Sequence, residues 1–302
     1  MPRRMLLLAA LVASAVALAG CSATVPDDGR IRVTASTDVY GQIAAAVGGS
    51  AVSVTAIIDR PSEDPHEFEV SAADQLAVNR AQLIVQNGAG YDPFMPQLIA
   101  ARPKPAVPVL TAATLSPAWP GGGADATPDG FNEHVFYDLG TMKALASRIA
   151  ADLGRIDPGG KAGFATRLAS FTAGIDALQA EQATLESRHG GAQIFVTEPL
   201  PLYLTQGAGL YNATPAAFSE AVEAGDDVPP STMLQATQLL RVRDVRALIA
   251  NSQAGGPETT AVIAEAKTRG IPVLEWSETL PTGLTYLQWM TRNLDQLKGA
   301  LG

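Results

Sequence analysis

From Ile31 onward, short apolar runs of strand length alternate with stretches whose apolar residues recur at helical spacing. In the first half of the chain, this pattern predicts strands at Ile31–Thr37, Val52–Ile58, Gln82–Asn87 and Val107–Leu110, and helices at Tyr40–Val47, Ser71–Ala81, Pro93–Ala101 and Thr141–Leu153. Such alternation is typical of parallel sheets, because a parallel strand can follow another only after a crossover connection, which is usually a helix. The pattern therefore predicts a lobe of the α/β class.

A second cycle of the same kind begins near Gln193. It predicts strands at Gln193–Thr197, Ala213–Phe218, Val245–Asn251 and Ile271–Trp276, and helices at Pro201–Ala208, Thr232–Arg241, Pro257–Arg269 and Thr285–Leu301. Between the cycles, Lys161–Arg188 keeps helical apolar spacing without a proline, which predicts a rod of about 40 Å. We therefore expect an α/β fold with two lobes, residues 31–157 and 190–302. Each lobe has a mainly parallel sheet flanked by helices, and one long rigid helix within residues 158–189 joins them.

The first twenty residues read as an export signal rather than as part of the fold. Arg3 and Arg4 precede an apolar run, Met5–Leu18, that is shorter than the roughly 20 residues of a membrane-spanning helix. The run closes with small residues directly before Cys21, the only cysteine of the chain. This segment resembles a bacterial lipobox, which implies a signal peptide over residues 1–20, lipidation of Cys21, a tether over residues 21–30 and an extracytoplasmic location at the cell membrane. An unmodified signal peptide with a chance cysteine is the alternative.

The composition excludes several classes of function. The chain carries 30 Asp plus Glu against 21 Lys plus Arg, a net charge of −9, whereas a nucleic-acid-binding protein needs a basic patch. A single cysteine excludes a disulfide framework and a thiolate metal cluster. The Gly-x-Ser-x-Gly and His-Glu-x-x-His motifs of common hydrolases are absent from the sequence.

The sequence contains three histidines. His66 follows the second predicted strand, and His134 lies shortly before the helix predicted at Thr141–Leu153. Either residue taken alone is more often a solvated loop histidine than a ligand. His189 ends the long helix, where a histidine commonly interacts with the helix dipole.

Two glutamates follow strands of the second half. Glu198 comes directly after Gln193–Thr197, and Glu278 comes just after the last predicted strand. Ligands of open parallel sheets bind outside the carboxyl ends of the strands, although a glutamate there is often only a solvated charge. Two imidazoles from one lobe and two carboxylates from the other could enclose a divalent cation in the cleft between the lobes.

Three motifs resemble those of a known family: Asp64-Pro65-His66-Glu67-Phe68-Glu69, Asn132-Glu133-His134-Val135-Phe136 and Val196-Thr197-Glu198. From about Ile31 to the carboxyl terminus, the chain resembles the cluster A solute-binding lipoproteins of bacterial ABC importers for manganese, zinc or iron. In that family, two histidines of the amino-terminal lobe and two residues of the carboxy-terminal lobe hold the metal. The resemblance implies His66, His134, Glu198 and Glu278 as ligands. The family usually has Asp at the fourth position, where this chain offers Glu278, with Glu275 as the alternative.

The resemblance also implies a function without catalysis: a monomeric receptor captures a divalent transition metal and delivers it to a permease subunit in the membrane. Imidazole and carboxylate donors suit Mn²⁺, Fe²⁺ or Zn²⁺ rather than Cu(I). Many zinc receptors of the family have His at the third ligand position and a His-rich loop, whereas this chain has Glu198 and no histidine in Ser116–Gly130. Mn²⁺ is therefore the expected metal, with Zn²⁺ a close second. A metal-dependent hydrolase and a surface adhesin with a structural metal are the alternatives.

Overall fold

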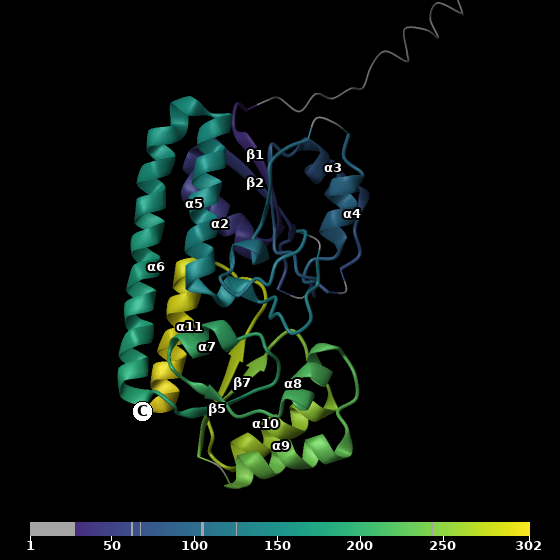
Figure 1. The fold of residues 1–302 in the computed structure, drawn as a ribbon, viewed down its shortest axis with the longest axis vertical. Coiled ribbons are helices and arrows are strands. Elements are labelled where there is room, and N and C mark those ends of the chain that lie inside the picture. Colours follow the sequence, from purple (N-terminus) through teal and green to yellow (C-terminus); the bar gives the residue numbers. More distant parts are fainter. Residues whose placement is uncertain (1–27, 62, 67, 104–105, 125, 243) are drawn as a thin grey trace, which may run out of the picture. The chain divides into compact units, whose positions relative to one another are not determined.

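The computed structural model describes residues 28–61, 63–66, 68–103, 106–124, 126–242 and 244–302. The expected signal peptide and Cys21 lie outside the described residues. Residues Ile31–Gly302 form one compact unit, which Figure 1 shows as a ribbon. In the described part of the chain, no helix has the length and apolar character that crossing a membrane requires.

The first lobe is built on a four-stranded parallel sheet. Its strands are β1 (Ile31–Thr37), β2 (Val52–Ile58), β3 (Leu83–Gln86) and β4 (Val109–Thr111), in the spatial order β2-β1-β3-β4. Its helices are α2 (Asp38–Gly48), α3 (Ala72–Arg80), α4 (Phe94–Ala100) and α5 (Leu139–Ile156), with 3₁₀ turns η1 (Gly49–Ala51), η2 (Ala113–Leu115) and η3 (Val135–Tyr137). Successive residues of a strand point to opposite faces. Leu83 and Val85 therefore pack with α2 and α5, while Ile84 packs with α3 and α4.

The second lobe repeats this plan. Its strands are β5 (Gln193–Val196), β6 (Tyr211–Asn212), β7 (Val245–Asn251) and β8 (Val273–Trp276), all parallel, in the order β6-β5-β7-β8. Its helices are α7 (Leu202–Gly207), α8 (Ala216–Glu223), α9 (Pro230–Val242), α10 (Pro257–Thr268) and α11 (Tyr286–Leu301). One face of the sheet packs with α8, α9 and α10, and the other joins the core that contains α11.

The long helix α6 (Lys161–His189), preceded by the 3₁₀ turn η4 (Pro158–Gly160), runs along both lobes (Figure 1). It contacts α2 and α5 of the first lobe and α7 and α11 of the second. One hydrophobic core consequently includes buried residues of both sheets and of α6. The predicted fold class is confirmed: two parallel sheets flanked by helices, with one long helix between them in the sequence.

The strand predicted at Ala213–Phe218 is wrong. The strand is the shorter β6, and α8 begins at Ala216. Phe218, Ala221 and Val222 have the i, i+3, i+4 spacing of a helix face, and they pack in the core beneath α8. The other predicted elements exist: β1, β2 and β7 have the predicted bounds, and the ends of the rest differ by a few residues. Ser71 and Asp74 form a capping box at the start of α3, where the side chain of each residue bonds the backbone of the other.

Candidate metal centre

The two carboxylates of the second lobe lie beyond the carboxyl ends of neighbouring strands. Glu198 follows β5 and Glu278 follows β8, and β7 lies between these strands in the sheet. Asn251, the last residue of β7, donates from Nδ2 to Glu198 Oε2 at 2.6 Å and to Glu278 Oε1 at 2.8 Å. Both glutamates are buried. The alternative residue Glu275 is exposed on β8, so the structure brings Glu278 rather than Glu275 to this place.

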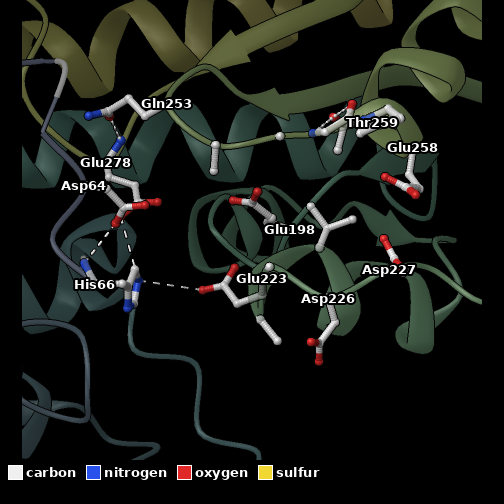
Figure 2. Close-up of a pocket in the computed structure, with 17 residues that line it drawn as sticks. Asp64, His66, Glu198, Glu223, Asp226, Asp227, Gln253, Glu258, Thr259 and Glu278 are labelled. Carbon is white, nitrogen blue, oxygen red and sulfur yellow. Dashed lines mark hydrogen bonds and ion pairs between the residues drawn. The ribbon is translucent and has the colours of Figure 1, made fainter.

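His66 reaches the same place from the loop after β2, as Figure 2 shows. Its backbone N–H donates to Asp64 Oδ1 at 2.8 Å, and its Nε2 lies 4.0 Å from Glu278 Oε2. The ring of Tyr91 packs edge-on against the imidazole, with the ring centroids 5.3 Å apart. The Tyr91 hydroxyl also donates to the backbone carbonyl of Glu278, at 3.3 Å. Tyr91 therefore contacts a candidate ligand of each lobe.

His134 immediately precedes η3 and is fully buried. Its Nδ1 lies 2.8 Å from Asn132 Oδ1, an atom that can only accept a hydrogen bond. The proton must therefore sit on Nδ1, which leaves the lone pair of Nε2 available to a metal ion. Asn132 in turn donates from Nδ2 to the backbone carbonyl of Pro199, next to Glu198, at 3.0 Å. The side-chain amide of Asn132 thus orients His134 of the first lobe and contacts the loop of the second lobe that carries Glu198.

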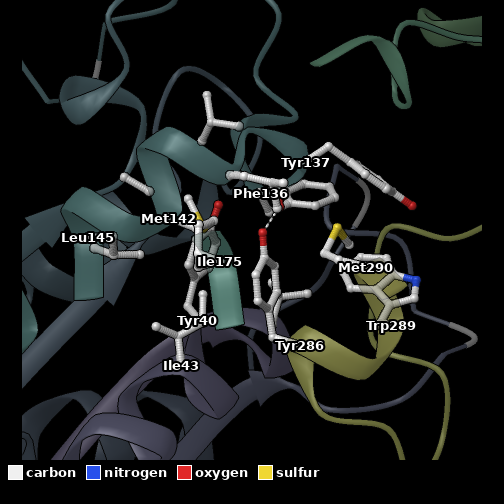
Figure 3. Close-up of a cluster of buried hydrophobic side chains, with 14 of the residues drawn as sticks. Tyr40, Ile43, Phe136, Tyr137, Met142, Leu145, Ile175, Tyr286, Trp289 and Met290 are labelled. Atoms are coloured by element: carbon white, nitrogen blue, oxygen red, sulfur yellow. Dashed lines mark hydrogen bonds between the residues drawn. The ribbon is translucent and has the colours of Figure 1, made fainter. Parts of the chain in front are cut away.

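The residues after His134 anchor its loop in the core that the lobes share (Figure 3). Tyr137 stacks on Trp276 of β8, with ring centroids 5.5 Å apart, and Phe136 stacks on Trp289 of α11 at 6.2 Å. The hydroxyl of Tyr286 donates to the backbone carbonyl of Phe136 at 2.8 Å. The packing of Phe136 and Tyr137 against aromatic residues of the second lobe therefore fixes the position of His134 relative to that lobe.

Gln253 joins the two loops that carry His66 and Glu278. Its Nε2 donates to the carbonyl of Pro61 at 2.8 Å, and its Oε1 accepts the backbone N–H of Glu278 at 2.6 Å. Gln253 lies beside Glu278 in Figure 2. The third histidine, His189, ends α6 and belongs to neither cluster of candidate ligand atoms found among the described residues.

Sequence reasoning missed a fifth residue of the site, Glu223, which is the last residue of α8. Its Oε1 lies 3.4 Å from His134 Nε2 and 4.0 Å from His66 Nε2. Figure 2 shows this carboxylate pointing toward His66. The helical spacing of Phe218, Ala221 and Val222 is the signal that could have placed it, because that spacing predicts a helix in this segment, next to Glu223.

Unpartnered polar atoms converge at this site. In the described part of the chain, nine buried side-chain nitrogen or oxygen atoms have no hydrogen-bond partner, and five belong to the residues above. These five atoms are His66 Nε2, His134 Nε2, Glu198 Oε1, Glu223 Oε2 and Glu278 Oε2. A buried polar atom without a partner is costly, typically by about 1–3 kcal/mol each, and demands an explanation. Every one of the five can donate a lone pair to a cation.

Burial also alters the acidity of these groups. It raises the pKa of Glu278 to about 8 and that of Glu223 to about 9, in both cases with neighbouring carboxylates adding to the shift. Burial raises the pKa of Glu198 as well, against the hydrogen bond from Asn251. It lowers the pKa of His134 to about 3. At neutral pH, His134 and Glu223 are therefore both uncharged, and their short approach is not an ion pair.

A cavity of about 430 Å³ opens onto the site. Asp64, His66, Glu198, Glu223 and Glu278 line it together with three further acidic residues, Asp226, Asp227 and Glu258 (Figure 2). No lysine or arginine is among the described residues of its wall. An acidic, partly enclosed wall of this kind attracts cations and excludes anions.

The sequence of the chain is similar to those of two metal-binding lipoproteins. The chain is 22% identical over 305 residues to the manganese-binding lipoprotein MntA of Halalkalibacterium halodurans, and the match covers 95% of each protein. It is 26% identical over 157 residues to the manganese-binding lipoprotein MntA of Bacillus subtilis, a match that covers 50% of each.

Solved structures share the fold. FpvC from Pseudomonas aeruginosa in complex with Mn²⁺ matches with a TM-score of 0.71 and 21% identity, over 90% of this chain and 98% of that one. A periplasmic metal binding protein from Candidatus Liberibacter asiaticus matches with a TM-score of 0.69 and 17% identity, over 90% of this chain and 100% of that one.

The family model described as zinc-uptake complex component A, periplasmic (ZnuA) matches residues 33–300, which span both lobes and every candidate ligand. The predicted resemblance to metal-receptor proteins is thereby confirmed. The chain belongs to the ZnuA family of metal solute-binding proteins.

Proposed function

We propose that this protein is the extracytoplasmic receptor of an ABC importer, which captures a divalent transition metal ion and delivers it to a permease in the membrane. The family is one of solute-binding components rather than enzymes, and its description as part of a zinc-uptake complex supports an importer. In this proposal, residues 31–157 and 190–302 act as the two lobes, and residues 158–189 connect them.

One observation carries the proposal: five lone-pair donors, from both lobes, are buried without partners in this site, and ligand atoms of His66, His134 and Glu223 lie within 4.8 Å of one another. A divalent cation would satisfy them at once and would neutralise the carboxylates. We assign His66, His134, Glu198 and Glu278 as ligands, with His134 oriented by Asn132 and the two glutamates held by Asn251. Outer partners of this kind commonly set the orientation and affinity of metal ligands.

Mn²⁺ is the favoured cargo, and Zn²⁺ is the second choice. Oxygen donors combined with imidazoles suit Mn²⁺, Fe²⁺ and Zn²⁺. The curated relatives named above are manganese-binding lipoproteins, which supports Mn²⁺ here. Since Zn²⁺ binds most such donor sets more tightly than Mn²⁺ does, selectivity in the cell would depend on metal availability and on the geometry of the site.

Loss of a proposed ligand should abolish tight binding. We expect His66→Ala and Glu278→Gln to lower Mn²⁺ affinity at least about 100-fold, because a direct ligand contributes more than the outer partners whose loss costs 10–100-fold. The matched control is His189→Ala, which removes an imidazole outside the site and should bind like the wild type. Isothermal titration calorimetry measures all three. Equal affinities for His66→Ala and His189→Ala would show that the wrong histidines have been assigned.

Metal binding should release protons at neutral pH. With its pKa raised to about 8, Glu278 is largely protonated at pH 7 and must lose that proton to bind a cation. Affinity should therefore rise between pH 6 and pH 8, approaching tenfold per pH unit for each proton released. Since the pKa of His134 is lowered to about 3, its titration does not contribute in this range. Calorimetry at pH 7 in two buffers of different ionisation enthalpy counts the protons. Buffer-independent heats, together with a constant affinity from pH 6 to 8, would rule out this mechanism.

We further propose that the mature protein is anchored by lipid at Cys21. The small residues before the only cysteine support this, as does the naming of both MntA relatives as lipoproteins. The intact mass of protein extracted from native membranes should equal that of residues 21–302 plus a diacylglyceryl group on the Cys21 sulfur. A mass that corresponds to an unmodified chain would contradict the anchor.

A further inference from the structure

Glu223 occupies a costly position that four ligands alone do not explain. Its side chain is only 19% exposed, and it ends α8, where the negative end of the helix dipole disfavours a carboxylate. Glu133, Glu198, Glu278 and Asp64 are close enough to disfavour its charge further. Burial, the helix dipole and the neighbouring carboxylates thus all disfavour a charged carboxylate at this position. A bound cation would offset all three effects.

The distances between Glu223 and the histidines are close to those expected for donors bound to one metal ion. A metal ion bonded at about 2.1 Å to two neighbouring donors holds those donors about 3.0–3.4 Å apart, in octahedral or tetrahedral geometry. Glu223 Oε1 lies 3.4 Å from His134 Nε2, which is shorter than the 4.0 Å between His66 Nε2 and Glu278 Oε2. Glu223, His66 and His134 also form one of the two groups of described residues whose ligand atoms all lie within 4.8 Å of one another.

The fully buried His134 provides independent support. Its Nε2 has no hydrogen-bond partner although the carboxylate of Glu223 lies beside it. Since the hydrogen bond to Asn132 keeps the proton on Nδ1, Nε2 offers only a lone pair. A lone pair and a carboxyl oxygen at this spacing can bind the same cation once the carboxyl group loses its proton.

We propose that Glu223 is an additional ligand of the transported ion and that it selects Mn²⁺ over Zn²⁺. This inference rests on the proposed function. With Glu223, the site offers two imidazoles and three carboxylates. Protein sites that hold Zn²⁺ with protein ligands alone are almost always four-coordinate and tetrahedral, whereas Mn²⁺ suits octahedral, oxygen-rich coordination. A fifth protein ligand therefore adds more to the binding of Mn²⁺ than to that of Zn²⁺.

The cavity supplies a matched control for simple charge attraction. Asp226 lines the same wall three residues further on and is exposed. It belongs to neither group of candidate ligand atoms among the described residues. Replacing Asp226 removes one negative charge from the cavity without removing a donor from the site.

The test compares Glu223→Gln with Asp226→Asn by calorimetric titration with Mn²⁺ and with Zn²⁺. For Glu223→Gln, we expect the ratio of Mn²⁺ to Zn²⁺ affinity to fall at least about tenfold. For Asp226→Asn, we expect an unchanged ratio and small, salt-dependent changes for both metals. X-ray absorption of the Mn²⁺-loaded Glu223→Gln protein should show one ligand fewer or one long Mn–O distance. An unchanged affinity ratio with an unchanged Mn²⁺ spectrum would overturn the proposal.

Two further measurements separate the possible failures. If the wild type binds neither metal, or if His66→Ala binds like the wild type, the proposed function itself is wrong. If the wild type binds, His66→Ala does not, and Glu223→Gln keeps the wild-type ratio, only the role of Glu223 is wrong. Thermal unfolding of the metal-free Glu223→Gln protein shows whether it folds. We expect stability equal to or above that of the wild type, because the substitution removes a buried acid.

Discussion

One amide group holds two buried carboxylates side by side. The Nδ2 of Asn251 donates to Glu198 and to Glu278, and it can do so because β7 lies between β5 and β8. Asn251 satisfies only one oxygen of each glutamate, which leaves Glu198 Oε1 and Glu278 Oε2 buried without a hydrogen-bond partner. The second lobe therefore presents a pair of acceptors whose proximity is unfavourable in the absence of a cation. His134 of the first lobe faces the site with a lone pair rather than with a positive charge.

An arrangement of this kind needs support from the rest of the fold. The shared core, with Trp276 and Trp289 packed against the residues that follow His134, buries a large aromatic area close to the site. Aromatic burial of this size stabilises by several kcal/mol, so the fold can tolerate unsatisfied polar atoms elsewhere. Gln253 and Asn132 then join loops of the two lobes by hydrogen bonds at the site itself. The unfavourable polar site and the favourable core are thus two parts of one interface.

Much of the fold follows from sequence pattern, whereas the site only partly does. The bounds of β1, β2 and β7 match the prediction because each strand consists mainly of β-branched or small residues. Strand ends in parallel sheets also pointed to Glu198 and Glu278. The strand predicted at Ala213–Phe218 failed because a short apolar run reads equally well as strand or helix.

That failure also concealed Glu223, whose position depends on α8. Asn132 and Asn251 could not be predicted as parts of the site, because a neutral amide next to a strand or a turn is common and acquires its role only through tertiary contacts. The acidity of the site is likewise a property of the folded chain. Burial raises the pKa of Glu278 and lowers that of His134, and neither shift can be read from residue type.

The central claim is that groups from both lobes bind a single ion between them. Anomalous X-ray diffraction at the manganese edge, from crystals of the Mn²⁺-loaded protein, tests it most directly. We predict one strong peak at about 2.0–2.3 Å from Nε2 of His66 and His134 and from carboxylate oxygens of Glu198 and Glu278. A peak bound by one lobe alone, or located away from these residues, would contradict the account.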